Sequence, residues 1–138
     1  MIRPAKPEDY ARCLDLLHHY SVGAVDNWGQ TFVVENGNGI IGFAVCRILD
    51  EHIPNRMGAA LSQRIGKLEP LIIEPDHSWA LHKLCERALY YFQDMGCMAV
   101  EGMILADNMK LREYVSRFFG AYNRSPVGIV LRKDLTED

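Results

Sequence analysis

The sequence has no surplus of basic residues, no long apolar run and no paired cysteine motif, and each absence excludes a class of protein. Its 15 Lys and Arg residues are fewer than its 18 Asp and Glu residues. We therefore expect no nucleic-acid partner, because binding to phosphates requires a basic surface. The longest apolar stretch, residues 39–45, is much shorter than the roughly 20 residues that cross a bilayer. The first residues lack the apolar segment of a signal peptide. These features predict a cytoplasmic protein with no membrane partner.

The cysteines and histidines show no metal-binding pattern. The four cysteines lie far apart, without a C-x-x-C pair: Cys13, Cys46, Cys85 and Cys97. His18 and His19 are adjacent and would point to different sides of a helix, and the five-residue separation of His77 and His82 is not a ligand spacing. We therefore expect free thiols in a reducing compartment and no metal cofactor.

The length and composition predict a single domain over residues 1–138. Hydrophobic residues make up 49% of the chain and charged residues 24%, which is typical of globular proteins. A chain of this length buries roughly two-thirds of its unfolded surface. No internal repeat or linker divides the sequence.

The first half of the chain predicts a helix followed by a β-hairpin. Apolar residues recur at helical spacing in a helix over residues 7–19, which begins with a proline and two acidic residues. Residues 31–35 and 40–49 are rich in β-formers and flank the Asn-Gly-Asn-Gly turn at 36–39. Residues 50–66 contain Pro and Gly, and we expect an irregular excursion there.

The second half alternates strands and helices. We expect a strand at 68–74, a long helix at 79–95, a strand at 98–104, a last helix from 107 or 108 to 120, and two short strands within 121–134. The strand–helix–strand order of residues 68–104 favours a parallel crossover, whereas the hairpin must pair antiparallel. The sequence thus predicts an α/β protein with a mixed sheet and helices on both faces.

Four stretches stand in an order that resembles a known superfamily. They are MIRPAKPEDYARCLDLL, TFVVENGNGIIGFAV, GKLEPLIIEPDH and DNMKLREYVSRFFGAY. They resemble, in turn, the opening strand and helix, the central hairpin, the fourth strand with its turn, and the last helix of the GNAT-superfamily N-acetyltransferases. The chain is also similar to small uncharacterised bacterial GNAT-like proteins. The resemblance covers residues 2 to about 134 and implies a GNAT-like, mostly antiparallel central sheet.

The resemblance implies acetyl-CoA as cosubstrate, with its pyrophosphate at the start of the long helix. Members of the family carry a Gln/Arg-x-x-Gly-x-Gly/Ala loop there, whereas residues 76–83, DHSWALHK, contain neither glycine nor arginine. The implied cofactor-binding residues at this helix and at the last one are His77, Ser78, Trp79, Ala80, Leu81, His82 and Asn108. The resemblance also implies that three residues contact the pantetheine arm through their backbone groups: Leu71, Ile72 and Ile73. Trp79 either plugs the phosphate loop, stacks on an adenine or caps the edge of the core, and the last is our expectation.

The resemblance also assigns two catalytic candidates. Glu69 matches a carboxylate that deprotonates an amine, directly or through water, although a solvated structural glutamate is the alternative. Tyr114 is a candidate acid for the departing thiolate, although its helical spacing also fits a core residue. Pro70 lacks an N–H group, which favours a local bulge beside Glu69.

Three hypotheses for the function follow. The first is an acyltransferase that moves an acetyl group from acetyl-CoA to a small-molecule or peptide amine by direct attack. The second is a catalytically inactive GNAT-like module that senses a ligand or binds a partner, which the glycine-free loop favours. The third is a generic α+β domain without a cleft. A free sheet edge near the C-terminus would also allow a homodimer.

Overall fold

The computed structural model describes residues 1–20, 24–54, 60–77, 79–104, 117, 122–123 and 129–135. By its internal contacts the chain divides into two compact units. Unit 1 consists of Met1–Arg47 and Leu68–Tyr91, and unit 2 consists of Ile48–Lys67 and Phe92–Asp138. A single domain over the whole chain stays a prediction.

Seven strands are hydrogen-bonded in the order β1-β2-β3-β4-β5-β7-β6. In chain order the elements are β1 (Ile2–Pro4), the 3₁₀ helix η1 (Pro7–Asp9), α1 (Tyr10–Tyr20), β2 (Gln30–Asn36), β3 (Gly39–Pro54), β4 (Ala60–Ile73), the 3₁₀ helix η2 (Pro75–His77), α2 (Trp79–Asp94), β5 (Ala99–Ile104), β6 (Tyr122–Asn123) and β7 (Ile129–Asp134). The strands β3 and β4 each run through both units.

The pairing of the strands confirms a mixed, mostly antiparallel sheet. β2 is antiparallel to β1 and β3, and β7 is antiparallel to β5 and β6. β4 and β5 are parallel, as predicted from the helix that connects them, with Ile65 opposite Ala99 and Lys67 opposite Glu101. The paired residues of β4 lie just before the segment 68–74 in which we expected that strand.

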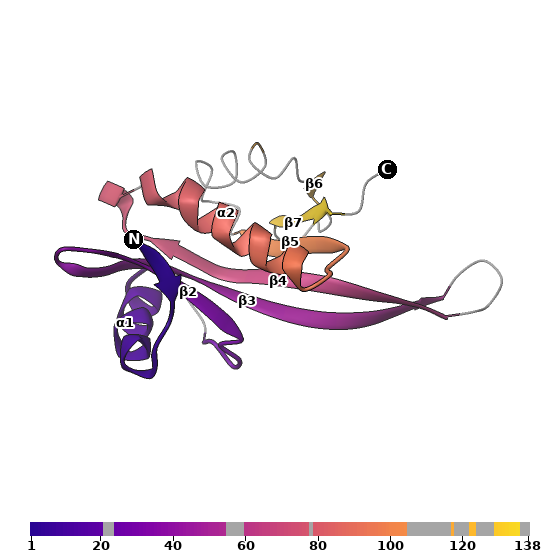
Figure 1. Ribbon diagram of the computed structural model, residues 1–138, viewed down its shortest axis with the longest axis horizontal. Helices are drawn as coiled ribbons and strands as arrows, with labels where there is room; N and C mark the ends of the chain where they lie inside the picture. The colour runs from indigo at the N-terminus through magenta and orange to yellow at the C-terminus, as the bar shows by residue number, and fades with distance from the viewer. Residues whose placement is uncertain are drawn as a thin grey trace. The chain divides into compact units, whose positions relative to one another are not determined.

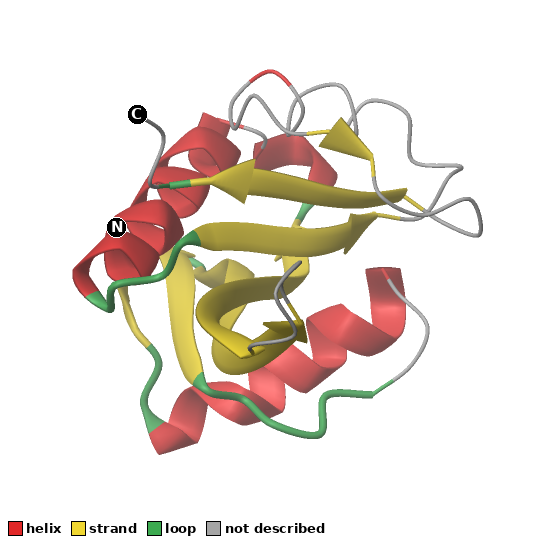
Figure 2. Ribbon diagram, turned by 90° about the vertical axis from the view of Figure 1, so that its right-hand side faces the viewer, coloured by secondary structure: helices red, strands yellow, loops and turns green. Residues whose placement is uncertain are grey.

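Helices cover both faces of the sheet, as predicted. Alternate residues of a strand point to opposite faces. Val33 of β2 and Phe43 of β3 belong to the core that α1 covers. Phe32, on the other face, contacts the ring of Tyr91 in α2 (centroids 5.8 Å apart) and lies beneath the guanidinium of Arg87, 4.4 Å from its centroid. Figures 1 and 2 show helices on either side of the strands.

The irregular excursion expected at residues 50–66 is wrong. β3 continues to Pro54 and β4 begins at Ala60, while residues 55–59 lie outside the described part of the chain. Pro54 ends its strand, where a missing N–H group costs little. Gly66 lies within β4 because a Cβ atom there would overlap the Phe92 ring, at 2.7 Å from its Cε1. The glycine is thus a packing requirement and not a strand breaker.

Gly42 lies beside a bulge in the pairing of β2 with β3 and at a close approach to β4. Val34 pairs with Gly42 and Glu35 with Ile40, so the register shifts by one residue at this point. A Cβ atom on Gly42 would lie 2.7 Å from the Ile72 carbonyl oxygen. β3 and β4 therefore approach closely beside the end of β4.

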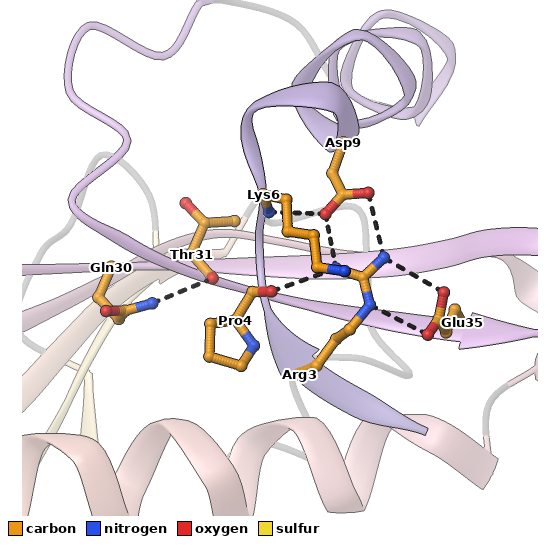
Figure 3. Close-up of polar contacts among 7 residues, drawn as sticks. All are labelled: Arg3, Pro4, Lys6, Asp9, Gln30, Thr31 and Glu35. Carbon is orange, nitrogen blue, oxygen red and sulfur yellow. Dashed lines mark hydrogen bonds and ion pairs between the residues drawn. The ribbon is translucent and has the colours of Figure 1, made fainter.

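An ionic clamp joins the first strand to the first helical turn and to β2 (Figure 3). Arg3 donates to both carboxylate oxygens of Asp9, at 2.7 and 3.1 Å, and to both of Glu35, at 3.0 and 3.2 Å. The Asp9 carboxylate also accepts the Lys6 N–H at 2.7 Å. The hydrogen bond from Arg3 is the main reason that the pKa of Asp9 lies below its usual value.

The ends of the remaining elements agree with the sequence where they are described. α2 ends at Asp94, and Gly96 follows it with a positive φ of 76°, as a helix-terminating glycine does. The two short strands expected within 121–134 are β6 and β7. The last helix predicted up to residue 120 lies outside the described residues, apart from residue 117. No helix within the described ranges is long and apolar enough to cross a membrane.

Candidate functional site

The candidate residues that the structure describes all lie in unit 1, on the end of β4, on η2 and on the first turn of α2. This segment is continuous in sequence, so a strand, a short turn and a helix start present the residues in order. Three candidates, Ser78, Asn108 and Tyr114, lie outside the described residues.

Glu69 forms an ion pair with Arg47 on the neighbouring strand β3. Arg47 Nη2 donates to Glu69 Oε1 at 3.1 Å, and the two side chains are 31% and 35% exposed. Solvent therefore reaches both groups although each has a partner. The carboxylate can bind an ammonium group or accept a proton, and the guanidinium can bind an anion or a carbonyl oxygen.

Arg47 is a functional candidate that the sequence reasoning missed. Its only signal was a basic residue two positions after the apolar stretch 39–45. Gly29 packs against it, since a Cβ atom there would overlap the Cys46 carbonyl oxygen and lie 3.1 Å from Arg47 Cγ. Gly29 has a φ of 47°, and its N–H donates to the Asn27 side chain at 2.9 Å. The segment before β2 thus packs against β3 at Cys46 and Arg47.

The three residues after Pro70 are divided between the core and partly exposed positions. Ile72 is buried in the core beneath α1, whereas Leu71 and Ile73 are half-buried. The peptide bond between Glu69 and Pro70 is cis. The bulge predicted at Pro70 and the backbone contacts assigned to these three residues stay predictions.

The turn after β4 is held by a residue from α1. Arg12 Nη2 donates to Glu74 Oε1 at 2.7 Å, and Arg12 Nε donates to the Ile40 carbonyl oxygen at 3.2 Å. The Glu74 N–H donates to the Ile41 carbonyl oxygen, and the His77 N–H donates to the Glu74 carbonyl oxygen. Arg12 therefore both fixes the turn and offsets the negative charge of Glu74.

The first turn of α2 presents two ring side chains to solvent, Trp79 and His82. Trp79 is 54% exposed and meets the ring of His77 edge-on, with centroids 6.4 Å apart. The expectation that Trp79 caps the core edge is therefore wrong; Ala80, fully buried, faces the core instead. Leu81 is half-buried, and His82 is exposed with its Nε2 atom 3.7 Å from a Glu86 oxygen.

These residues fit an anionic group at the start of α2. The first N–H groups of a helix lack intrahelical partners and carry partial positive charge. The first turn of α2 contains no acidic residue. Two acidic residues precede it in the sequence, Glu74, which is paired with Arg12, and Asp76 in η2. Because the segment 76–83 has no glycine, side chains occupy this helix start, and the largest of those described is Trp79. Among the described residues, no cluster of three or more His, Cys, Asp or Glu residues could hold a metal ion.

Comparison with solved structures identifies the fold. Naa50 from Arabidopsis thaliana, in complex with the bisubstrate analogue CoA-Ac-MVNAL, matches with a TM-score of 0.77 and 11% identity over 98% of each chain. The NatC complex bound to Gag peptide and CoA contains a chain with a TM-score of 0.72 and 17% identity, covering 99% of this chain and 98% of that one. The aminoglycoside 6'-N-acetyltransferase AAC(6')-IG from Acinetobacter haemolyticus matches with a TM-score of 0.67 and 14% identity, over 86% of this chain and 88% of that one.

No protein-family model and no curated protein matches the sequence. Two of the structural matches nevertheless cover 99% and 98% of this chain, with TM-scores of 0.72 and 0.77. The chain therefore has the GNAT fold of N-acetyltransferases, as the resemblance of its sequence implied.

Proposed function

We propose that this protein is an N-acetyltransferase that moves an acetyl group from acetyl-CoA to a small-molecule or peptide amine. The observation that carries the proposal is the full-length match to structures bound to CoA or a CoA-containing analogue. The start of α2, which fits an anion, and the partly exposed carboxylate of Glu69 support it.

In this proposal the turn and first helical residues bind the cosubstrate. The pyrophosphate lies on the N–H groups at the start of α2, beside His77, Ser78, Trp79, Ala80, Leu81 and His82. The indole of Trp79 is exposed beside this helix start, where it offers an aromatic face to a nucleotide base. The pantetheine arm follows the backbone of residues 71–73, and Asn108 contributes from outside the described residues.

The chemical step requires a neutral amine. A primary amine is protonated near neutral pH because its pKa is about 10, so a base must remove a proton before attack. Glu69 takes this proton, directly or through one water molecule. The nitrogen then attacks the thioester carbonyl carbon, the C–N bond forms, and the C–S bond breaks with its electron pair left on sulfur. We assign the proton that neutralises this thiolate to Tyr114, which regains a proton from solvent as the acetylated nitrogen loses its second proton to solvent.

A second candidate function is a GNAT-like module without catalysis that senses a ligand or binds a partner. The observation that favours it is the glycine-free sequence of residues 76–83, with the exposed indole of Trp79 at the start of α2. Both candidates retain a ligand at the start of α2, and only the first requires Glu69 as a base. A homodimer and a cytoplasmic location stay predictions.

Substitution of the base tests the enzymatic proposal. General-base catalysis contributes about 10²–10⁴-fold, so Glu69→Gln is expected to lower turnover by about that factor and to leave the affinity for acetyl-CoA unchanged. Thiol release from acetyl-CoA measures turnover, and calorimetry measures affinity. Asp50→Asn serves as the control, because it removes a carboxylate on β3 that is also paired with an arginine, Arg64. Full turnover in Glu69→Gln removes this residue from the mechanism.

A further inference from the structure

The ion pair between Arg47 and Glu69 presents two opposite charges, and both bear on the chemical class of the acceptor. We propose that the acceptor carries a carboxylate next to its amine, as an α-amino acid does, with the ammonium bound to Glu69 and the carboxylate bound to Arg47. The inference rests on the proposed function and names the class of its acceptor.

An amine that binds at Glu69 changes the charge balance of the ion pair. The two side chains are joined through Arg47 Nη2 and Glu69 Oε1, and each is about one-third exposed. An amine that binds to Glu69 competes with the guanidinium for the same carboxylate. A simple amine would separate a partly buried pair and leave Arg47 without its counter-charge, which is unfavourable. A zwitterionic acceptor supplies both opposite charges at once.

The planar guanidinium of Arg47 suits a carboxylate ligand. A guanidinium presents several N–H donors in a plane and binds a carboxylate through two of them. Nη2 of Arg47 donates to Glu69, and the proposal assigns the other N–H groups of the guanidinium to the acceptor carboxylate. The carboxyl and amino groups of an α-amino acid are attached to one carbon atom, which matches the short span between the two paired side chains.

The segment that packs against Arg47 is held in place by several contacts. Gly29 lies against the Arg47 stem, with no room for a Cβ atom. The ring of the preceding residue, Trp28, contacts those of Tyr10 and Phe43 in tilted arrangements, with ring centroids 5.0 and 5.9 Å away. The Thr31 hydroxyl donates to the Trp28 carbonyl oxygen at 2.6 Å. The segment at Trp28 and Gly29 therefore holds its position beside Arg47 before a ligand binds, which lowers the entropic cost of binding.

The same arrangement selects against polycationic acceptors. A second positive charge on the acceptor would meet Arg47 at short range, and like charges held close together repel. Polyamines are therefore expected to be poor substrates compared with amino acids of similar size.

The test uses matched acceptors that differ in the carboxylate alone. Thiol release from acetyl-CoA is measured with amino acids, with the amines left after their decarboxylation, and with the corresponding amino acid amides. Phenylalanine, phenethylamine and phenylalaninamide form one such set, and alanine and glutamate supply others. One charge-assisted contact is expected to raise kcat/KM for the amino acid roughly 10- to 100-fold over the amine. The amide, which represents a peptide N-terminus, is expected to lie between them.

Two variants and a control assign the effect to Arg47. Arg47→Gln is expected to remove the preference: kcat/KM falls more for amino acids than for decarboxylated amines, so that their ratio approaches one. Arg47→Lys keeps the charge and is expected to retain the order of preference with a smaller ratio. Arg64→Gln removes another arginine–carboxylate pair, that of Arg64 with Asp50 at 3.2 Å, and is expected to leave the preference intact.

The outcomes separate this inference from the proposed function. Acetylation of amines or amides as efficient as that of amino acids overturns the inference and leaves an N-acetyltransferase. A preference that persists in Arg47→Gln also overturns it. Absence of acetyl-CoA binding, or of any acetylated amine, overturns the proposed function and the inference with it.

Discussion

Replacement of Asp9 by alanine tests how the fold is held at its first strand. Asp9 is 7% exposed and accepts three hydrogen bonds, two from the Arg3 guanidinium and one from the Lys6 N–H. Removal of one partner from a buried pair costs about 3–5 kcal/mol. Arg3 is 21% exposed and keeps Glu35 as a partner, so we expect a smaller loss of about 2 kcal/mol in the free energy of unfolding.

Thermal and urea unfolding measure this loss. For a chain of this length, 2 kcal/mol corresponds to a Tm lower by roughly 7 °C. Glu35→Ala is the matched control, because it removes the other, more exposed carboxylate from the same guanidinium, and it is expected to have the smaller effect. A larger effect of Glu35→Ala than of Asp9→Ala would refute the reasoning.

The dependence of this difference on pH gives a second check. The pKa of Asp9 is lowered mainly by its hydrogen bond from Arg3, so its carboxylate stabilises the fold fully above the unfolded pKa of about 3.9. That contribution is lost as the pH falls through the lower pKa of the folded state. The difference in stability between wild type and Asp9→Ala is therefore constant near neutral pH and shrinks in acid. A difference that stays constant to pH 2 contradicts this account.

Two further predictions concern packing and the thiols. Gly42→Ala places a methyl group 2.7 Å from the Ile72 carbonyl oxygen, and urea unfolding is expected to show a loss of about 1–3 kcal/mol; unchanged stability would show that the backbone yields at no cost. Burial raises the pKa of Cys13 to about 11 and that of Cys85 to about 12. Both thiols are therefore expected to resist a thiol-specific reagent at pH 8 until the protein unfolds; rapid labelling of either in the folded protein would contradict this burial.

The parts of the fold that depend on local pattern were predictable. The helix at Trp79–Asp94 and its terminating Gly96 follow from apolar spacing and from a residue that adopts a positive φ. The hairpin follows from its turn residues, and the parallel pairing follows from the helix that connects β4 to β5. Each of these features is encoded within a few neighbouring residues.

The features that failed depend on contacts between distant residues. Gly66 reads as a strand breaker until the ring of Phe92, 26 positions later in the sequence, is seen to occupy the space of its side chain. Arg47 pairs with Glu69 across 22 positions, which only the alignment of two long strands can establish. The exposure of Trp79 depends on Ala80 taking the core-facing position in the same turn, which a one-residue change in helix phase would reverse.

Calorimetric titration of the purified full chain with acetyl-CoA, and separately with free CoA, tests the central claim most directly. The start of α2 is the cosubstrate site in this account, since it lacks acidic residues in its first turn and its neighbour Glu74 is neutralised by Arg12. Saturable binding of both ligands to one site per chain is the predicted result. A folded protein that shows no binding heat with either ligand at several temperatures would contradict the claim.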